Sequence, residues 1–227
     1  MPKTPGTSSV DTIVFDVDGT LVDTNYHHAM AWFRAFGWYD LVPPLWRIHR
    51  AIGMGGDRLV AAVAGQCLED RRGDDIREAW REEYERLITE VRPFDGATAL
   101  LASVRERGLT VVLASSGPAA HVEHYLDLLD ARGLAEHWTT AEDAAESKPA
   151  PDLVEIALNK VGAVEAILVG DSTWDIEAAN RAGIPSYAVR TGGYSAAELE
   201  GAGACHVYDS LAEFGSRFRD DAGVGTA

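Results

Sequence analysis

Two aspartates that directly follow a short apolar run constrain this chain more than any other feature. Residues 12–15 (TIVF) are apolar or β-branched, which is typical of a buried strand, and the segment DVDGT (16–20) comes next. Side chains two residues apart share one face of a strand, so Asp16 and Asp18 are expected close together, and Gly19 permits a sharp turn after them. Because close carboxylates repel each other unless a cation or a shared proton relieves them, this segment predicts a divalent metal site with a carboxylate free to attack a substrate.

From residue 109 onward, short apolar runs alternate with helical patterns. Strands are predicted over 109–114, 137–140, 166–169, 186–189 and 205–208. Helices are predicted over 118–130, 151–161 and 174–182. Strands and helices in alternation are typical of a parallel sheet covered on both faces, so we expect an α/β fold with a Rossmann-like parallel sheet core. The segments 192–193 and 220–227 are expected to be loop or disordered.

Residues 23–92 break this alternation because they contain no convincing strand. Helices are predicted there over 26–36, 44–51, 57–66 and 74–91. An all-helical segment between the first strand and the rest of the sheet indicates a small inserted α-helical cap, with the return connection at 93–96. We therefore expect a core of residues 1–22 plus 93–227 and a helical cap of residues 23–92.

Chemical groups also follow later strands of the predicted sheet. Ser115, Ser116 and Gly117 come after the strand 109–114, where hydroxyls and backbone N–H groups at a helix start can bind an anion. Asp171 follows the strand 166–169, and Asp175 lies one helical turn further on, so both can face the same site.

Lys148 is one of three lysines in the chain and is expected to offset negative charge at this site. The same predicted site contains four acids: Asp16, Asp18, Asp171 and Asp175. A phosphate dianion would be strongly repelled there without a cation. Mg²⁺, which prefers oxygen ligands in octahedral geometry, fits this set of residues.

The predicted cap carries 10 arginines and no lysine against 12 acids. The arginines of one Arg/Glu-rich helix are expected to form a solvated face: Arg71, Arg72, Arg77, Arg81 and Arg86. Arg47, Arg50 and Arg58 are better candidates for contact with a ligand, because arginine binds phosphate in a bidentate fashion. The cap aromatics are expected to form its core: Trp32, Phe33, Phe36, Trp38 and Trp46. His27 and His28 are adjacent and do not suit a shared ion, but either can touch substrate or the acid at position 18.

Four segments taken in order, DVDGT (16–20), Ser115, Lys148 and GDSTWD (170–175), resemble the four motifs of the haloacid dehalogenase superfamily. The resemblance spans roughly residues 9–215 and implies a helical cap and Mg²⁺. It also implies that Asp16 is a nucleophile forming an aspartyl-phosphate and that Asp18 is a general acid/base. Asp16, Asp171 and the backbone carbonyl of Asp18 would bind the metal, with Asp175 binding it through water or supporting Lys148. Ser115 would bind the transferring phosphoryl group, and Thr20 would hold the loop.

The function expected from this resemblance is a Mg²⁺-dependent phosphatase acting on a small phosphorylated metabolite such as phosphoglycolate or a sugar phosphate. The alternative is a phosphomutase of the β-phosphoglucomutase type, whose cap start looks somewhat like residues 26–32. Those mutases carry adjacent acids in the fourth motif, whereas Gly170 precedes Asp171 here. Dehalogenases lack the acid at position 18, phosphonoacetaldehyde hydrolase needs a cap lysine, and signalling receiver modules are shorter and lack the helical insert.

The formal net charge of −16 argues against nucleic acid and anionic membranes as partners. Without an apolar leader or a long apolar run, a cytoplasmic location is expected. The two cysteines, Cys67 and Cys205, are expected to be free thiols. Both a monomer and a homodimer remain open.

Overall fold

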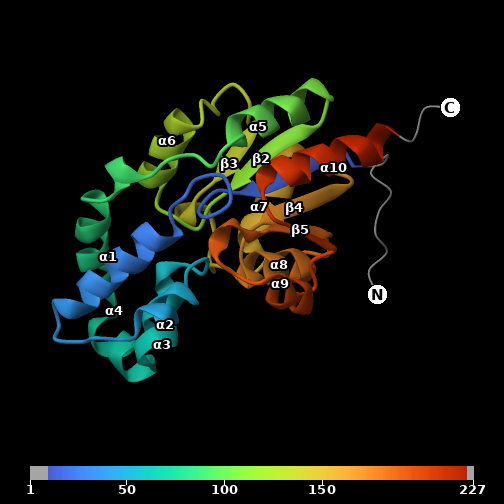
Figure 1. The fold of residues 1–227 in the computed structure, drawn as a ribbon. Coiled ribbons are helices and arrows are strands. Elements are labelled where there is room, and N and C mark those ends of the chain that lie inside the picture. Colours follow the sequence, from blue (N-terminus) through green and yellow to red (C-terminus); the bar gives the residue numbers. More distant parts are fainter. Residues whose placement is uncertain (1–9, 224–227) are drawn as a thin grey trace.

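The structure, a computed structural model, describes residues 10–223. The first nine residues, on which the expectation of no leader rests, and the last four lie outside this range. Parallel strands form one sheet in the order β3-β2-β1-β4-β5-β6 (Figure 1). The strands are β1 (Thr12–Asp16), β2 (Thr110–Ala114), β3 (His137–Thr139), β4 (Ala166–Gly170), β5 (Ser186–Val189) and β6 (His206–Tyr208). The chain order of the strands reverses at β1, so the carboxyl end of β1 lies at the switch point where open α/β sheets bind ligands.

Both faces of the sheet are covered by helices, which confirms the α/β fold. One face packs against α5 (Ala97–Glu106), α6 (Ala119–Leu128) and α10 (Leu211–Gly223). The other packs against α7 (Asp152–Val161) and α8 (Thr173–Arg181), with α9 (Ala196–Ala202) beside α8. The strand β1 is buried along its whole length because Phe15 packs toward the first helical layer and Val14 toward the second. This two-sided burial explains why residues 12–15 carry no charge.

A separate group of helices lies between β1 and α5 in the chain and to one side of the sheet (Figure 1). It consists of α1 (Asn25–Gly37), α2 (Leu45–His49), α3 (Gly56–Ala64), α4 (Gln66–Glu85) and the 3₁₀ turn η1 (Ile88–Glu90). The two connections to the sheet run side by side, because Val22 pairs with Pro93 and the Asp23 N–H donates to the Arg92 carbonyl at 2.9 Å.

Two predictions about these helices were wrong in detail. The long helix expected over 74–91 begins at Gln66 and ends at Glu85. Its start is set by Gly65, whose φ of +90° separates α3 from α4, and Gly73 lies within the helix rather than before it. Trp38 and Trp46 are 49% and 66% exposed, so they do not belong to the core expected of the cap aromatics, whereas Trp32 and Phe36 are buried.

The segments expected to be loop or disordered also differ. Residues 220–223 belong to α10, and the remainder of that tail lies outside the described residues. Gly192 closes the 3₁₀ turn η3 (Arg190–Gly192) and is buried.

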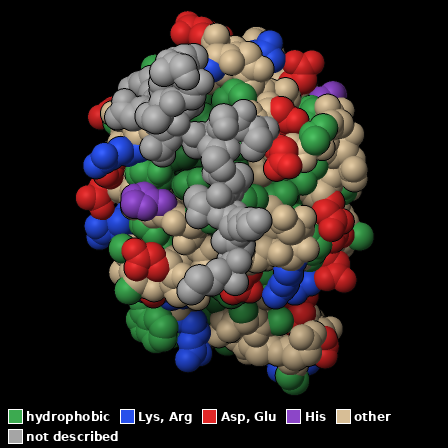
Figure 2. Space-filling view, turned by 90° about the vertical axis from the view of Figure 1, so that its right-hand side faces the viewer, with side chains coloured by type: hydrophobic (Ala, Val, Ile, Leu, Met, Phe, Trp, Pro, Cys, Tyr) green, Lys and Arg blue, Asp and Glu red, His purple; other side chains and the backbone are tan. Residues whose placement is uncertain are grey.

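The described helices include none that is both long and apolar enough to cross a membrane. Cys67 and Cys205 are free thiols. On the face shown in Figure 2, outside the part drawn in grey, basic and acidic side chains are interspersed rather than gathered into a continuous basic area.

Candidate active site

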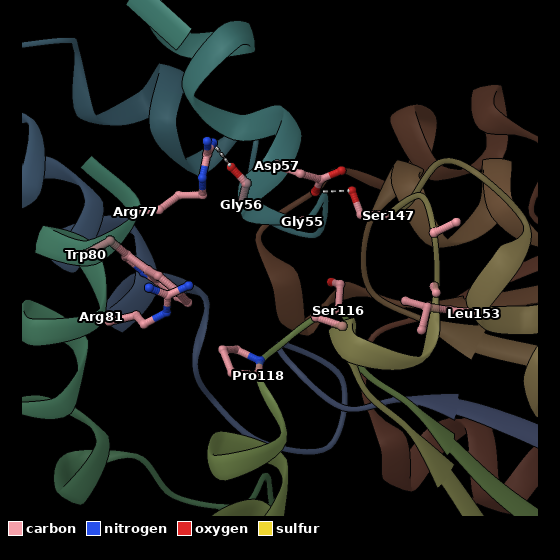
Figure 3. Close-up of a pocket in the computed structure, with 13 residues that line it drawn as sticks. Gly55, Gly56, Asp57, Arg77, Trp80, Arg81, Ser116, Pro118, Ser147 and Leu153 are labelled. Atoms are coloured by element: carbon pink, nitrogen blue, oxygen red, sulfur yellow. Dashed lines mark hydrogen bonds between the residues drawn. The ribbon is translucent and has the colours of Figure 1, made fainter. Parts of the chain in front are cut away.

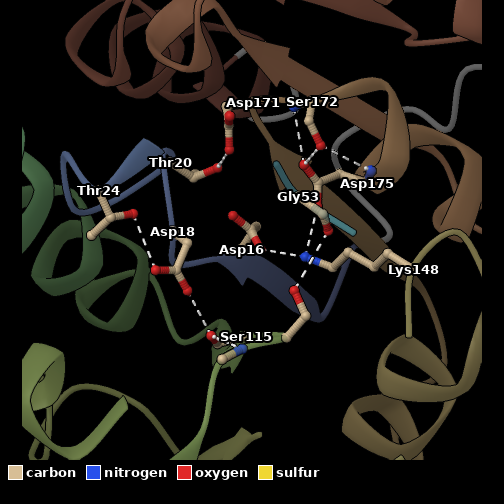
Figure 4. A network of polar contacts seen from close by, with 12 residues as sticks. Asp16, Asp18, Thr20, Thr24, Gly53, Ser115, Lys148, Asp171, Ser172 and Asp175 are labelled. Atoms are coloured by element: carbon tan, nitrogen blue, oxygen red, sulfur yellow. Dashed lines mark hydrogen bonds and ion pairs between the residues drawn. The ribbon is translucent and has the colours of Figure 1, made fainter. Parts of the chain in front are cut away.

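The carboxyl end of β1 brings three acids and one lysine together in the centre of the sheet (Figure 4). Asp16 ends β1, Asp171 follows β4, and Asp175 lies in the first turn of α8. One ligand oxygen from each of these acids can be chosen so that all lie within 4.8 Å of one another. The Lys148 ammonium forms a short ion pair with Asp16 and a second one, 2.7 Å long, with Asp175 Oδ1. All four side chains are almost completely buried.

Burial and neighbouring charge perturb these groups strongly. Burial and the negative charge of Asp175 raise the pKa of Asp16 well above its ordinary value, and they raise that of Asp171 to about 7. Burial alone would lower the pKa of Lys148, but the charges of Asp16 and Asp175 raise it above the ordinary lysine value. The buried site therefore carries more negative charge than its lysine offsets, which is the electrostatic setting of a cation site.

Asp171 is held by two side chains from the segment that follows β1. Thr20 Oγ1 donates to Asp171 Oδ1 at 2.8 Å, and Asn25 Nδ2 donates to Oδ2 at 2.8 Å. Gly192 approaches so closely that a Cβ atom there would lie 1.8 Å from Asp171 Oδ2. Only glycine fits this close approach, so the turn expected to be unstructured helps to confine Asp171.

The start of α8 orients Asp175. Ser172 and Asp175 form a capping box, in which the Ser172 N–H and hydroxyl donate to Asp175 Oδ2 at 3.0 and 2.6 Å. The other carboxylate oxygen is thereby turned toward Lys148. Of the two roles the sequence left open for Asp175, the structure shows the contact with Lys148.

Asp18 points away from the three-acid cluster toward a different set of donors. Its carboxylate accepts from Ser115 Oγ at 2.7 Å and Thr24 Oγ1 at 3.1 Å, and it lies 3.0 Å from His28 Nε2. Burial would raise the pKa of Asp18, but the hydrogen bond and charge of His28 and the two hydroxyls lower it to about 2. The pKa of Asp16 is thus raised and that of Asp18 is lowered, as expected for carboxylates with different roles.

His28 comes from α1 and is fixed by aromatic packing. Its ring stacks on Tyr84 of α4 with centroids 3.9 Å apart, and Trp80 lies at 5.7 Å. The Tyr84 hydroxyl is hydrogen-bonded to the Tyr125 hydroxyl of α6. Asp18 is therefore held by groups from both the helical segment (the helices from α1 to η1) and the sheet domain (the sheet and the helices that cover it).

His121 of α6 packs edge-on against Trp80 and beside Tyr84. Burial, followed by the charge of His28, lowers the pKa of His121 to about 4, well below the ordinary 6.5. In the unfolded chain His121 becomes protonated below its ordinary pKa of 6.5. In the folded protein it becomes protonated only near pH 4. The folded state therefore loses stability as the pH falls through this window.

We expect His121 to account for about 2–4 kcal/mol of the stability lost between pH 7 and pH 4. The measurement is denaturant unfolding at both pH values for the wild type, His121→Phe and the control His206→Gln, whose histidine is exposed. His121→Phe should lose less stability on acidification than the other two. Equal losses in all three proteins would contradict the expectation.

Two adjoining cavities lie between the helical segment and the sheet domain. The inner cavity has a volume of about 50 Å³ and is lined by Asp16, Asp18, His28 and Gly53, among others. The outer cavity, of about 240 Å³, is lined by α4 on one side and the loops after β2 and β3 on the other (Figure 3). Trp80, Gly56 and Ser116 line both, so the two are neighbouring parts of one binding region.

Some of the remaining predicted residues line the cavities, and others lie outside them. Ser116 and Gly117 line the inner cavity. Arg50 forms an ion pair with Glu198 at 2.6 Å, and Arg58 forms one with Glu146 at 2.5 Å. Arg47 is exposed, with its guanidinium over the Trp46 ring. None of these three arginines is among the described residues that line either cavity.

Several side chains at the site were not singled out by sequence reasoning. Asn25 binds Asp171, and Trp80, Arg77 and Arg81 line the outer cavity although the arginines were expected on a solvated face. A signal was present in α4, where Ile76, Trp80 and Tyr84 repeat every four residues. The two arginines directly follow members of this stripe and so flank the inward face.

Comparison with known proteins places this geometry among hydrolases. A family model for haloacid dehalogenase-like hydrolases matches residues 13–189. An N-acetylmuramic acid 6-phosphate phosphatase of Pseudomonas aeruginosa is 28% identical over 185 residues, covering 79% of this chain and 81% of that protein. A phosphoglycolate phosphatase of Rhodospirillum rubrum is 29% identical over 217 residues, covering 89% and 88%. The crystal structure of a hydrolase from Pseudomonas syringae has a TM-score of 0.87 and 31% identity, covering 92% and 98%.

Proposed function

The chain belongs to the family of haloacid dehalogenase-like hydrolases and is a phosphatase of that family, and from this premise we propose that it hydrolyses a small phosphomonoester with Mg²⁺ through an aspartyl-phosphate. The observation that carries the proposal is the placement of two carboxylates at one cavity. Asp16 sits beside Lys148 and Asp171 on one side, and Asp18 sits beside Ser115 on the other (Figure 4).

In the first step, an Asp16 oxygen attacks the phosphorus and Asp18 gives its proton to the departing oxygen of the ester. Asp18 then takes a proton from the water that attacks the phosphorus, and inorganic phosphate leaves Asp16 free again. The Lys148 ammonium is positioned to offset the negative charge that develops on the equatorial oxygens.

The contact between Ser115 and Asp18 explains how an acid with a pKa of about 2 becomes protonated. A bound phosphoryl group would accept the Ser115 hydroxyl hydrogen bond and so remove one of the donors that keep the Asp18 pKa low. The negative charge of the phosphate would raise this pKa further. Substrate binding thus favours the protonated form of Asp18 that the first step requires.

The residues at the site fit Mg²⁺. Asp16 and Asp171 offer carboxylate oxygens from two neighbouring strands, and the surplus negative charge favours a hard cation over a neutral ligand. Asp16, Asp171 and the backbone carbonyl of Asp18 would hold the ion, and Asp175 would orient Lys148. When bound, Mg²⁺ supplies charge stabilisation for the transferring phosphoryl group and lowers the pKa of Asp16, so that the nucleophile is ionised.

We expect thorough chelation with EDTA to abolish phosphatase activity and added Mg²⁺ to restore it. Mg²⁺ should also raise the melting temperature of the protein by several degrees, because an ion at a hundred times its Kd stabilises the folded state by about 2.7 kcal/mol. Asp171→Asn should lose both the activity and the thermal shift. The assignment would be contradicted if the wild-type protein stays active after chelation and its melting temperature does not change with Mg²⁺.

We further propose that residues 23–92 act as a cap domain that closes over the substrate. The two side-by-side connections at 22 and 93 would allow it to move as a unit. Contacts that would break on opening include the Arg50–Glu198 and Arg58–Glu146 ion pairs and the Ser147–Asp57 hydrogen bond of 2.6 Å. A closed cap excludes bulk water from the inner cavity during transfer.

The experiment that tests the proposed function is phosphate release from a panel of small phosphomonoesters in the presence of Mg²⁺. The panel contains phosphoglycolate, β-glucose 1-phosphate, hexose 6-phosphates and nucleoside monophosphates. We expect at least one compound to exceed the others by tenfold or more, equivalent to about 1.4 kcal/mol in the transition state. If no phosphate is released and β-glucose 1-phosphate becomes glucose 6-phosphate once a bisphosphate primer is added, the enzyme is a mutase instead.

A further inference from the structure

We propose that the outer cavity binds the leaving group of the substrate, and that this group is a sugar or polyol carrying a second anion, which Arg81 binds. The proposal rests on the phosphatase function above and assigns the part of the substrate that is not the phosphoryl group. It follows from the volume of the cavity, the charges around it and the chemistry of its walls.

The position of the outer cavity separates it from the reacting atoms. Asp16 and Asp18 line the inner cavity, whose volume of about 50 Å³ leaves little space beyond a phosphoryl group. The outer cavity is several times larger and shares Trp80 and Ser116 with the inner one. A leaving group attached to a phosphoryl group at Asp16 would therefore extend past Trp80 into the outer cavity, which has room for more than a two-carbon acid.

Of the described residues that line this cavity, Arg81 is the cation that is available to a ligand. The guanidinium of Arg77, also in the lining, is already engaged by the carbonyl oxygen of Gly56 and the carboxylates of Glu69 and Asp74. Arg81 pairs with Glu78, whose side chain is 65% exposed, and exposed pairs one helical turn apart contribute only about 0.3–0.5 kcal/mol. A guanidinium held so weakly can turn to a carboxylate or phosphate and bind it in a bidentate fashion.

The opposite side of the cavity suits hydroxyl groups. Ser147 Oγ donates to Asp57 Oδ1 at 2.6 Å, and Figure 3 shows this pair across the cavity from Arg81. The Asp57 carboxylate can accept hydrogen bonds from hydroxyls, but it repels an anion, so it directs the charged end of a ligand toward Arg81. Trp80 lies beside Arg81 on the α4 side of the cavity and adds apolar ring surface to the lining, which suits the C–H groups of a sugar.

Matched substrates separate charge from size. One series keeps the glucose ring and the ester at carbon 1 and varies carbon 6: glucose 1-phosphate, glucuronic acid 1-phosphate and glucose 1,6-bisphosphate. A second series keeps the ester at carbon 6 of an open chain and compares neutral glucitol 6-phosphate with anionic 6-phosphogluconate. We expect kcat/KM for an anionic member to exceed that of its neutral counterpart by at least tenfold in at least one series. The preferred member then distinguishes a carboxylate from a second phosphate.

Arg81→Gln should lower kcat/KM for the anionic substrate at least tenfold more than for its neutral counterpart, and Arg81→Lys should retain part of the preference. The control is Arg86→Gln, which removes an exposed arginine of the same region that lines neither cavity and should leave the preference unchanged.

The outcomes separate this inference from the proposed function. Phosphate release without any charge preference, or an equal loss for anionic and neutral substrates in Arg81→Gln, would overturn the inference and leave the phosphatase intact. No release from any phosphomonoester would overturn both.

Discussion

Asp16→Asn should reduce kcat by at least about 10³-fold, or about 4 kcal/mol in the transition state, while the protein stays folded. An amide has nearly the shape of a carboxylate but cannot attack phosphorus. The variant should stay folded at pH 7, because the amide oxygen of asparagine can still accept the hydrogen bond of Lys148 and the repulsion by Asp175 is removed. The measurements are phosphate release and the melting temperature of wild type and variant.

The matched control for this variant is Asp209→Asn, which changes an exposed aspartate that pairs with Arg190. Its activity should equal that of the wild type. If Asp16→Asn keeps more than a few per cent of the activity in a folded protein, Asp16 is not the nucleophile.

Lys148→Met is expected to have the second large effect, because it removes the cation that the buried acids share. Without this ammonium, Asp16 and Asp175 lose their ion pairs, and breaking such a buried pair costs about 3–5 kcal/mol. The negative charge that develops on the transferring phosphoryl group is also no longer stabilised by the Lys148 ammonium. We therefore expect kcat to fall by at least about 10²-fold, or about 2.7 kcal/mol.

Lys160→Met serves as the control for this variant. Lys160 forms a partly exposed ion pair with Asp143, and such a pair contributes at most about 1 kcal/mol. Unfolding in denaturant without Mg²⁺ and steady-state kinetics with Mg²⁺ compare the two variants. Equal stability and equal activity of the two variants would show that Lys148 has no special role.

Most of the candidate catalytic cluster was predictable because its residues lie at or just after the ends of strands. Parallel strands end at one edge of a sheet, so locating the strands before Asp16, Ser115 and Asp171 was enough to place these groups together. The strand over 186–189 was predicted without error, and each of the other strands differs from its prediction by one residue at one end.

The helical segment was harder to predict because its contacts depend on which side of each helix faces inward. The exposure of Trp38 and Trp46 could not be predicted from their apolar character, since it depends on how α1 packs against α4 and how α2 packs against α1 and α3. The early start of α4 depends on the positive φ of Gly65, and the sequence pattern did not indicate this boundary. The hydrogen bond from Asn25 to Asp171 joins residues 146 positions apart, so no local sequence pattern predicts it.

The most direct test of the account is to trap the phosphorylated enzyme. The protein is quenched in acid during turnover of its best substrate with Mg²⁺, digested, and mapped by mass spectrometry for a phosphoryl group. We predict that the phosphoryl group lies on Asp16 and disappears in Asp16→Asn. A phosphoryl group on another residue, or an active enzyme that never carries one under rapid quenching, would contradict the central claim that Asp16 is the nucleophile.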